Sequence, residues 1–505
     1  MRPFLSAVVR SIPLILVLAA FPGETAAQLI SLKTVPVAAG DQFLIFPSRN
    51  LGMGGVSIAL DDMLLDPFVN PAKGARVGQG EFFSAPTFYS ISQNSGAART
   101  LPMGTLFSSG SWFGGGVVAL QQIETGSRFD FGPVPLDLAI TVPLPPQNTL
   151  SEQQSTNKYV QALVGRTIAG GKFAIGASAM LADLNAIDGV EHLYALASDI
   201  DQYGHIEDYR LGLTGVFADD RTIEAVVVHN RYSMTHDVTY VDWFVTDSLN
   251  WRFTPQVREE SNPDKTQTWG MHLGYVQPIA ESGWRVGGIL TANRMQHPKI
   301  PNYELQNIPR DPGHTWAYNL GVGLSKQEGP TTFGVDLVFE PAVSHTWQEA
   351  AGPTLAADSI TIIPDRGKTI ENRFNFSNAF VNIGMTRTID NAALQLGLGV
   401  RAYDYRLRQK DNVEITRRTQ DEQWMEWTPS WGLSFMFSDL ELRYTGRATT
   451  GSGRPGIARG FGGGFAEDAV ALASGGNILL APEGALTLQD ATVVTHRIGI
   501  SLPLR

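Results

Sequence analysis

The chain has 505 residues, of which 52 are glycine and none is cysteine, and its formal net charge is −11. Without cysteine it can form neither a disulfide nor a thiolate metal or nucleophile site, and its acidic balance argues against nucleic acid as a partner. Length alone would allow about three ordinary domains, although all-β barrels exceed that guideline as single units. No apolar stretch of transmembrane-helix length follows the first 27 residues, so the composition fits a soluble protein or a membrane barrel.

The first 27 residues have the features of a secretory signal peptide. Arg2 and Arg10 supply positive charge, Ile12–Phe21 form an apolar core of ten residues, and Ala26 and Ala27 end a small-residue cleavage site. A membrane-spanning helix needs about 20 apolar residues, so this core is too short for one. We predict that residues 1–27 are removed, the alternative being an uncleaved anchor.

The segment from Ser48 to Ala75 carries the most specific motif of the chain. Small residues lead into the acidic pair Asp61-Asp62 and then into the triplet that begins at Asn70. The small residues are Gly52, Gly54, Gly55, Ser57 and Ala59, and the triplet is Asn70-Pro71-Ala72. In this order the motif resembles the N-terminal signature of the FadL-type outer-membrane transporters of Gram-negative bacteria.

The resemblance implies an all-β fold, a transmembrane antiparallel β-barrel of about 14 strands with an N-terminal plug inside its lumen. It assigns residues 28–78 to the plug and 79–505 to the barrel. It also implies passive uptake of hydrophobic compounds such as long-chain fatty acids, with no cofactor and no enzymatic activity. The residues assigned to the plug are Arg49, Gly52, Gly54, Gly55, Asp61, Asp62, Asn70, Pro71 and Ala72.

Alternation of apolar with polar or small residues predicts strands after the motif. In residues 332–340, Phe333, Val335 and Leu337 share one face and Asp336 lies on the other. The same pattern occurs in residues 172–180, 394–401 and 431–437. Such alternation over about ten residues is typical of a barrel strand with an apolar exterior. A soluble periplasmic β-sandwich would show it too, so the connections have to distinguish the two folds.

Two kinds of connection alternate along the chain. Short turn signals lie at 109–111, 169–171, 218–220, 281–283, 328–330, 390–391 and 438–439. Longer polar or mixed segments lie near 125–155, 185–204, 236–265, 298–313, 346–369, 410–423 and 448–491. This alternation favours an outer-membrane barrel with periplasmic turns and external loops.

The number of strands stays open between 14 and 16 at this point. With a first strand near 80–91 and a last near 492–504, the turn pattern counts sixteen strands, whereas the resemblance implies fourteen. Residues 80–91 can be counted with the plug or with the barrel, and that choice changes the number.

Two stretches are candidates for transport. Gly114, Gly115 and Gly116 lie within one predicted strand, where glycines permit a bulge or kink that would open a window in the wall; close packing against the plug is the alternative. An apolar, proline-rich run at 134–146 is a candidate landing surface for hydrophobic substrate, and packing against other loops is the alternative. Its apolar residues are Val134, Leu136, Leu138, Ile140, Val142 and Leu144.

No stretch of the sequence has the residues of a catalytic, nucleotide or metal site. The glycines near Gly54 lack the lysine of a phosphate loop, and a calcium-like start at Asp199 has Arg210 where a glutamate is needed. The expected partners are outer-membrane lipids, a hydrophobic small molecule and the barrel assembly machinery, although the chain ends in Leu504-Arg505 where many such barrels end in an aromatic residue. The rival function is a PorV-like barrel that holds a secreted protein at the cell surface.

Overall fold

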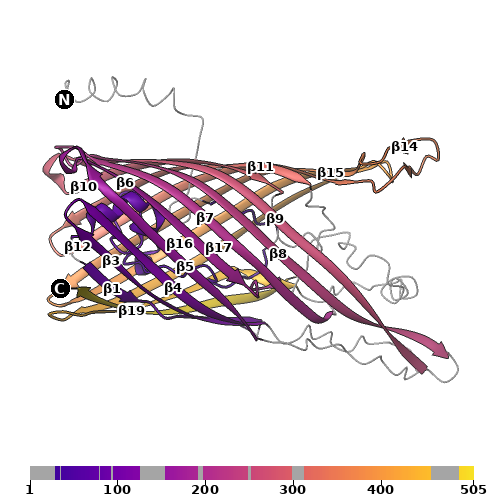
Figure 1. The fold of residues 1–505 in the computed structure, drawn as a ribbon, viewed down its shortest axis with the longest axis horizontal. Helices are drawn as coiled ribbons and strands as arrows, with labels where there is room; N and C mark the ends of the chain where they lie inside the picture. Colours follow the sequence, from indigo (N-terminus) through magenta and orange to yellow (C-terminus); the bar gives the residue numbers. More distant parts are fainter. Residues whose placement is uncertain are drawn as a thin grey trace.

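The computed structural model of the protein describes residues 29–34, 36–78, 80–92, 95–125, 154–190, 197–247, 252–297, 312–455 and 488–504. Both the predicted signal peptide and the apolar run at 134–146 lie outside these ranges. One antiparallel sheet of 17 strands makes up most of the molecule. Its strands wind around a common axis in a tilted, closed wall (Figure 1).

The wall closes because the last strand pairs with the first two. Its strands are β1 (Gly80–Ser84), β2 (Thr87–Ile91), β3 (Gly96–Ser109), β4 (Trp112–Thr125), β5 (Gln154–Ile168), β6 (Phe173–Leu184), β7 (Ala197–Val216), β8 (Thr222–Asp247), β9 (Arg252–Ile279), β10 (Trp284–Gln296), β11 (Gly313–Glu328), β12 (Thr331–Glu349), β15 (Lys368–Ile389), β16 (Ala392–Asp411), β17 (Thr416–Met436), β18 (Glu441–Pro455) and β19 (Leu488–Leu504). Strand β19 pairs antiparallel with β1 and with β2. The short hairpin of β13 (Thr354–Leu355) and β14 (Ile362–Ile363) forms a separate sheet.

The barrel has sixteen strand positions, so the fourteen implied by the family resemblance is wrong. Strands β1 and β2 both lie between β19 and β3 and together occupy one position in the sheet of 17 strands. The interruption at Ala85-Pro86 separates them, since proline cannot donate to the ladder. The count made from the turn pattern is confirmed, and residues 80–91 belong to the wall.

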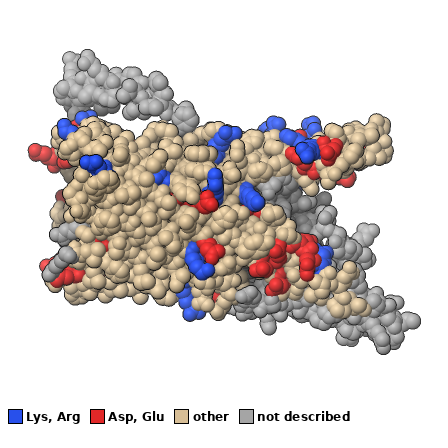
Figure 2. Space-filling view, in the orientation of Figure 1, with Lys and Arg blue, Asp and Glu red and all other residues tan. Residues whose placement is uncertain are grey.

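The two faces of the wall differ as the alternation predicts. On β12 the side chain of Leu337 is 49% exposed, whereas its neighbour Asp336 is 1% exposed. Leu396 on β16 and Val322 on β11 are likewise half exposed on the outside. In the view of Figure 2, a zone with few charged side chains separates the turn end from the loop-side half of the wall. The outer face therefore suits hydrocarbon and the inner face suits polar contacts.

The two ends of the wall also differ. The predicted short turns are confirmed, with connections of only a few residues such as Gly110-Ser111 and Gly329-Pro330. Several predicted loops are shorter than expected, because strands include residues 197–204, 236–247, 252–265, 410–411 and 416–423. Strands β8 and β9, for example, have 26 and 28 residues and project beyond the rest of the wall (Figure 1). Polar residues on both faces of a strand do not prevent pairing, since ladder bonds involve only the backbone.

The N-terminal segment, residues 29–78, contacts the inner face of the wall. Its elements are η1 (Leu51–Met53), α2 (Asp66–Val69) and η2 (Pro71–Arg76). Helix η1 packs against β15 to β18, and η2 packs against β3 to β7. None of the described helices has the length and apolarity needed to cross a membrane.

Candidate functional site

The Asn70-Pro71-Ala72 triplet ends one short helix and starts the next. The side-chain oxygen of Asn70 accepts a hydrogen bond from the backbone N–H of Ala72 at 3.1 Å, which satisfies a donor at the start of η2. Pro71 occupies the first helical position, where its missing N–H costs nothing. The amide nitrogen of Asn70 donates outward, to Glu224 Oε2 on β8 at 3.1 Å. One residue thus shapes the segment and attaches it to the wall.

Asp62 organises the segment from within. One of its oxygens accepts hydrogen bonds from the Ser48 hydroxyl and the backbone N–H of Arg49, both at 2.7 Å, and from that of Asn50 at 3.1 Å. The other accepts from the backbone N–H groups of Leu64 and Leu65. The carboxylate is 1% exposed, so these five donors replace its water.

The neighbouring carboxylate, Asp61, forms one ion pair within the segment and one with the wall. Its two oxygens bind the guanidinium groups of Arg76 at 2.5 Å and of Arg285 on β10 at 2.8 Å. Burial disfavours ionisation of Asp61, but these two arginines outweigh it and hold the pKa of Asp61 below its usual value. Asp61 is therefore a charged link between η2 and β10.

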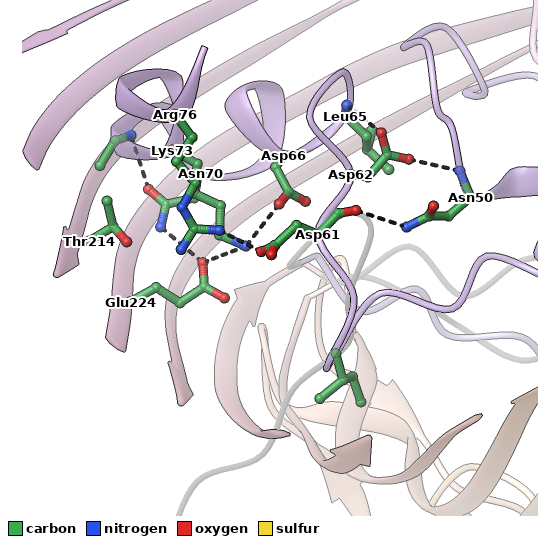
Figure 3. A network of polar contacts seen from close by, with 12 residues as sticks. Asn50, Asp61, Asp62, Leu65, Asp66, Asn70, Lys73, Arg76, Thr214 and Glu224 are labelled. Atoms are coloured by element: carbon green, nitrogen blue, oxygen red, sulfur yellow. Dashed lines mark hydrogen bonds and ion pairs between the residues drawn. The ribbon is translucent and has the colours of Figure 1, made fainter. Parts of the chain in front are cut away.

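Lys73 is the centre of a second charge cluster (Figure 3). Its ammonium lies 3.1 Å from Glu224 Oε2 and 3.4 Å from Asp66 Oδ2. Glu224 also faces His272 on β9, with 3.9 Å between Oε1 and Nε2. The side chains of Lys73, Asp66 and Glu224 are each at most 16% exposed. This cluster attaches α2 and η2 to β8.

The protonation states in this cluster follow from burial and from the shared ammonium. Burial raises the pKa of Asp66 to about 7, although Lys73 acts in the opposite direction. Burial alone would lower the pKa of Lys73, but Asp66 and Glu224 outweigh it and raise that pKa. Lys73 is therefore charged at neutral pH, and Asp66 titrates near neutrality.

The glycine run passes very close to the wall. A Cβ on Gly52 would lie 2.6 Å from Gln395 Oε1 and 3.0 Å from the Cα of Gly432. Gly54 has φ of +75°, which ends η1 in the left-handed region that side chains disfavour. Gly52 and Gly54 thus lie against the inner wall, whereas a Cβ on Gly55 would have no atom within 4 Å.

Wall side chains bind the backbone of the same run. Asp336 Oδ2 on β12 accepts from the N–H groups of Ser57 at 2.7 Å and Ile58 at 3.2 Å. Ser325 donates to the carbonyl of Ala59 at 2.7 Å. Arg49 reaches Glu441 at 3.0 Å and Glu81 at 3.3 Å. The segment is therefore bound to β11 and β12 through its backbone and to β18 and β1 through the Arg49 side chain.

The start of the segment makes a different kind of contact. Ile30 and Leu32, 3% and 4% exposed, cover an apolar surface on the inner wall. This surface, which we call the aromatic wall, lies in the loop-side half of the barrel and consists of Met295, Phe374, Phe376, Tyr405, Leu407 and Trp424. Next to this surface, Lys33 of the segment forms an ion pair with Glu426 on β17, with 2.5 Å between Nζ and Oε1.

The candidate glycines of the wall lie in an unbroken ladder. Strand β4 pairs with β3 and with β5 through Gly114, Gly115 and Gly116 without a change of register. A Cβ on Gly115 would lie 2.4 Å from the carbonyl oxygen of Thr105, and the atoms nearest to all three glycines belong to the neighbouring strands β3 and β5 rather than to the N-terminal segment. The landing surface at 134–146 lies outside the described residues.

Several functional residues were missed by the sequence analysis. Glu224, Arg285 and Asp336 bind the segment, and Phe374 and Phe376 form the aromatic wall. The sequence does contain a signal for Glu224, Arg285 and Asp336: each is a charged residue at an inward position of a strand, and such a charge needs a partner inside the barrel. Within the described ranges, no group of three His, Asp or Glu side chains is placed to hold a metal ion.

These features define a class of protein. A closed antiparallel wall with an even number of strand positions, an apolar exterior, a polar interior, and short turns at one end is an outer-membrane barrel. The chain is therefore a protein of the outer membrane of a Gram-negative-type bacterium.

Comparison with known proteins gives a likeness of fold. No protein-family model and no curated protein matches this chain. Among solved structures, a Pseudomonas aeruginosa FadL homologue is 12% identical, with 92% of this chain and 99% of that chain covered and a TM-score of 0.41. The Ralstonia pickettii toluene transporter TbuX is 10% identical (92% and 100% covered, TM-score 0.39), and the Pseudomonas putida toluene transporter TodX is 11% identical (95% and 100% covered, TM-score 0.39). These three proteins are similar to this chain in fold, at 10–12% identity.

Proposed function

We propose that the protein takes up hydrophobic compounds passively across the outer membrane, with long-chain fatty acids as one candidate class. The aromatic wall carries this proposal, because among the apolar clusters of the inner wall it is the one in the loop-side half that contains four aromatic rings and is covered by the start of the segment. Apolar pockets with few polar groups are the usual form of a small-molecule site. Its position near the loop end suits a ligand that arrives from outside.

The proposed site is occupied by the protein's own Ile30 and Leu32. A hydrophobic ligand would replace these two side chains on Phe374, Phe376 and Tyr405, exchanging one apolar contact for another. Because burial of apolar surface is non-directional, such an exchange requires no new geometry in the wall. The Lys33 ammonium, which pairs with Glu426, would become available to an anionic headgroup once that ion pair opened.

We propose that the rest of the segment is the plug that the family resemblance implies, within the assigned range 28–78. It is held by the buried charges of Asp61 and Lys73 and by the backbone contacts of Asp336. Breaking a buried ion pair by removing one partner costs about 3–5 kcal/mol. The start of the segment is held by the apolar contacts of Ile30 and Leu32, by a hydrogen bond from the Ile30 N–H to Asn293 and by the Lys33–Glu426 pair, without the charge clusters of Asp61 and Lys73, so we propose that it moves first.

Uptake of a radiolabelled long-chain fatty acid into vesicles containing the full chain tests the proposal. Phe374→Ala with Phe376→Ala removes two rings of the aromatic wall and should reduce uptake several-fold, whereas Phe435→Ala, an outward-facing ring that is 42% exposed, should not. Equal uptake by all variants would remove the aromatic wall from the route. A protein partner copurifying in equal amounts, with no uptake by the wild type, would support the PorV-like function instead.

A further inference from the structure

The outer face of the loop-side wall carries a row of basic side chains. In the antiparallel registers, His314 on β11 lies opposite His345 on β12, which lies opposite Arg373 on β15, which lies opposite Arg408 on β16. Residues that are directly opposite share a face of the sheet, so all four side chains point the same way. We call them the basic row.

The basic row is on the outside of the barrel. Its neighbours two positions along the strands, Val343 on β12 and Trp316 on β11, are 53% and 40% exposed, while the alternate residues Ser344 and Phe374 are completely buried. On β12 the outward apolar positions run from Phe333 to Val343, and His345 follows directly. An apolar face of that length matches the ~25 Å band of a barrel in a bilayer, which puts the row where lipid headgroups begin.

The charges of the two arginines in the row are not neutralised by the described part of the chain, whereas His345 faces Glu371 at 3.3 Å. Like charges that face each other across two strands destabilise the sheet, and Arg373 faces Arg408. Both are exposed, and neither makes an ion pair or hydrogen bond with another described residue. The nearby carboxylates have partners other than these two arginines: Glu371 pairs with Lys368 at 3.2 Å and with His345 of the row at 3.3 Å, and Asp421 pairs with Arg406 at 2.6 Å.

Aromatic side chains adjoin the row. Trp347 lies 5.0 Å from the His345 ring and 6.1 Å from the His314 ring. One pair further toward the membrane, Arg294 is stacked over Trp316 at 5.9 Å. Tryptophan collects at membrane interfaces, where its ring contacts both lipid and headgroup. The arrangement therefore combines cations with rings at headgroup depth.

From these observations we infer that the basic row binds the phosphate groups of an anionic glycolipid in the outer leaflet, with Arg373 and Arg408 as the main ligands. Guanidinium groups match phosphate oxygens bidentately, and basic residues near a membrane surface gain affinity for anionic lipid. The bound lipid would relieve the repulsion between the two arginines. This inference requires only the membrane orientation and is independent of transport.

Native mass spectrometry of the full chain in nonionic detergent tests the inference. The probes are lipid A with two phosphates and the same glycolipid without phosphate. The wild type should retain the phosphorylated form about tenfold more strongly, and Arg373→Gln with Arg408→Gln should remove most of that preference. Arg387 is an exposed arginine at the turn end of β15, so Arg387→Gln is the matched control and should keep the preference for the phosphorylated glycolipid.

Three results would overturn the inference. The first is an unchanged preference in the double variant while heat-dependent gel mobility shows a folded barrel. The second is equal retention of the two glycolipids by the wild type. The third is displacement of the lipid by inorganic phosphate, because it would assign the row to the free ion instead.

Discussion

Replacing Lys73 by methionine should release the N-terminal segment without destroying the barrel. Methionine keeps most of the volume of lysine but leaves Asp66 and Glu224 without the ammonium that lies 3.4 Å and 3.1 Å away. Removing one partner of a buried ion pair costs about 3–5 kcal/mol. The wall has its own backbone ladder, so this loss falls on the attachment of α2 and η2.

Hydrogen exchange of the backbone in residues 61–76 measures that attachment. Each 1.36 kcal/mol is a factor of ten in an opening equilibrium, so protection there should fall by roughly a hundredfold to several thousandfold, while protection in β12 and β15 stays unchanged. Lys158→Met is the matched control, because Lys158 pairs with Asp183 at 2.8 Å but both side chains are 58% exposed. Such surface pairs contribute little.

A rescue variant separates charge from packing. Adding Asp66→Asn and Glu224→Gln to Lys73→Met removes the uncompensated carboxylates, so most of the lost protection should return. If Lys73→Met leaves exchange in residues 61–76 unchanged, or if the triple variant is no better than the single one, the charge cluster does not hold the segment.

Three further predictions concern the segment and the wall. Deleting residues 41–75 should leave a barrel that assembles but leaks small polar solutes; unchanged dye permeability in membrane-inserted protein would contradict a plug. Arginine at Leu396 or Phe435 should reduce assembly by ~2–4 kcal/mol of insertion free energy, whereas arginine at the inward Ser434 should be tolerated better; equal folded yields would refute the assignment of faces. Because the pKa of Asp66 rises from 3.8 to about 7 on folding, the folded state binds more protons between those values, so attachment should weaken as pH rises through this window and level off above it. In Asp66→Asn, hydrogen exchange corrected for intrinsic rates should lose that pH dependence; a persisting dependence would assign it to another group.

Much of the wall is predictable because a strand is a local pattern. Residues such as Leu337 and Asp336 alternate with a period of two, and that period decides which faces lipid and which faces the lumen. Turns such as Gly329-Pro330 are also local, which is why counting them correctly predicts sixteen strand positions. The fourteen strands implied by the family resemblance are wrong, because the number of strands depends on which strand pairs with the first ones to close the barrel, here β19.

The extent of the strands was harder to predict from composition. The polar or mixed segment 236–265 is predicted to be a loop, yet β8 and β9 pair through its residues 236–247 and 252–265. A hairpin can extend beyond the membrane with polar residues on both faces, because its hydrogen bonds require only backbone groups. Nothing local in the sequence marks where such pairing stops.

The sequence by itself determined the outline: a small-residue run, two carboxylates and a capped Asn70-Pro71 turn in front of an alternating wall. Only the tertiary structure decided the partners. Asp61 binds Arg285, 224 positions away, and Asn70 binds Glu224, 154 positions away. Closure of the barrel brings such residues together, and contacts at that separation depend on the whole register of the sheet rather than on any segment. Pairing of the neighbouring strands β15, β16 and β17 likewise brings their rings together in one aromatic wall.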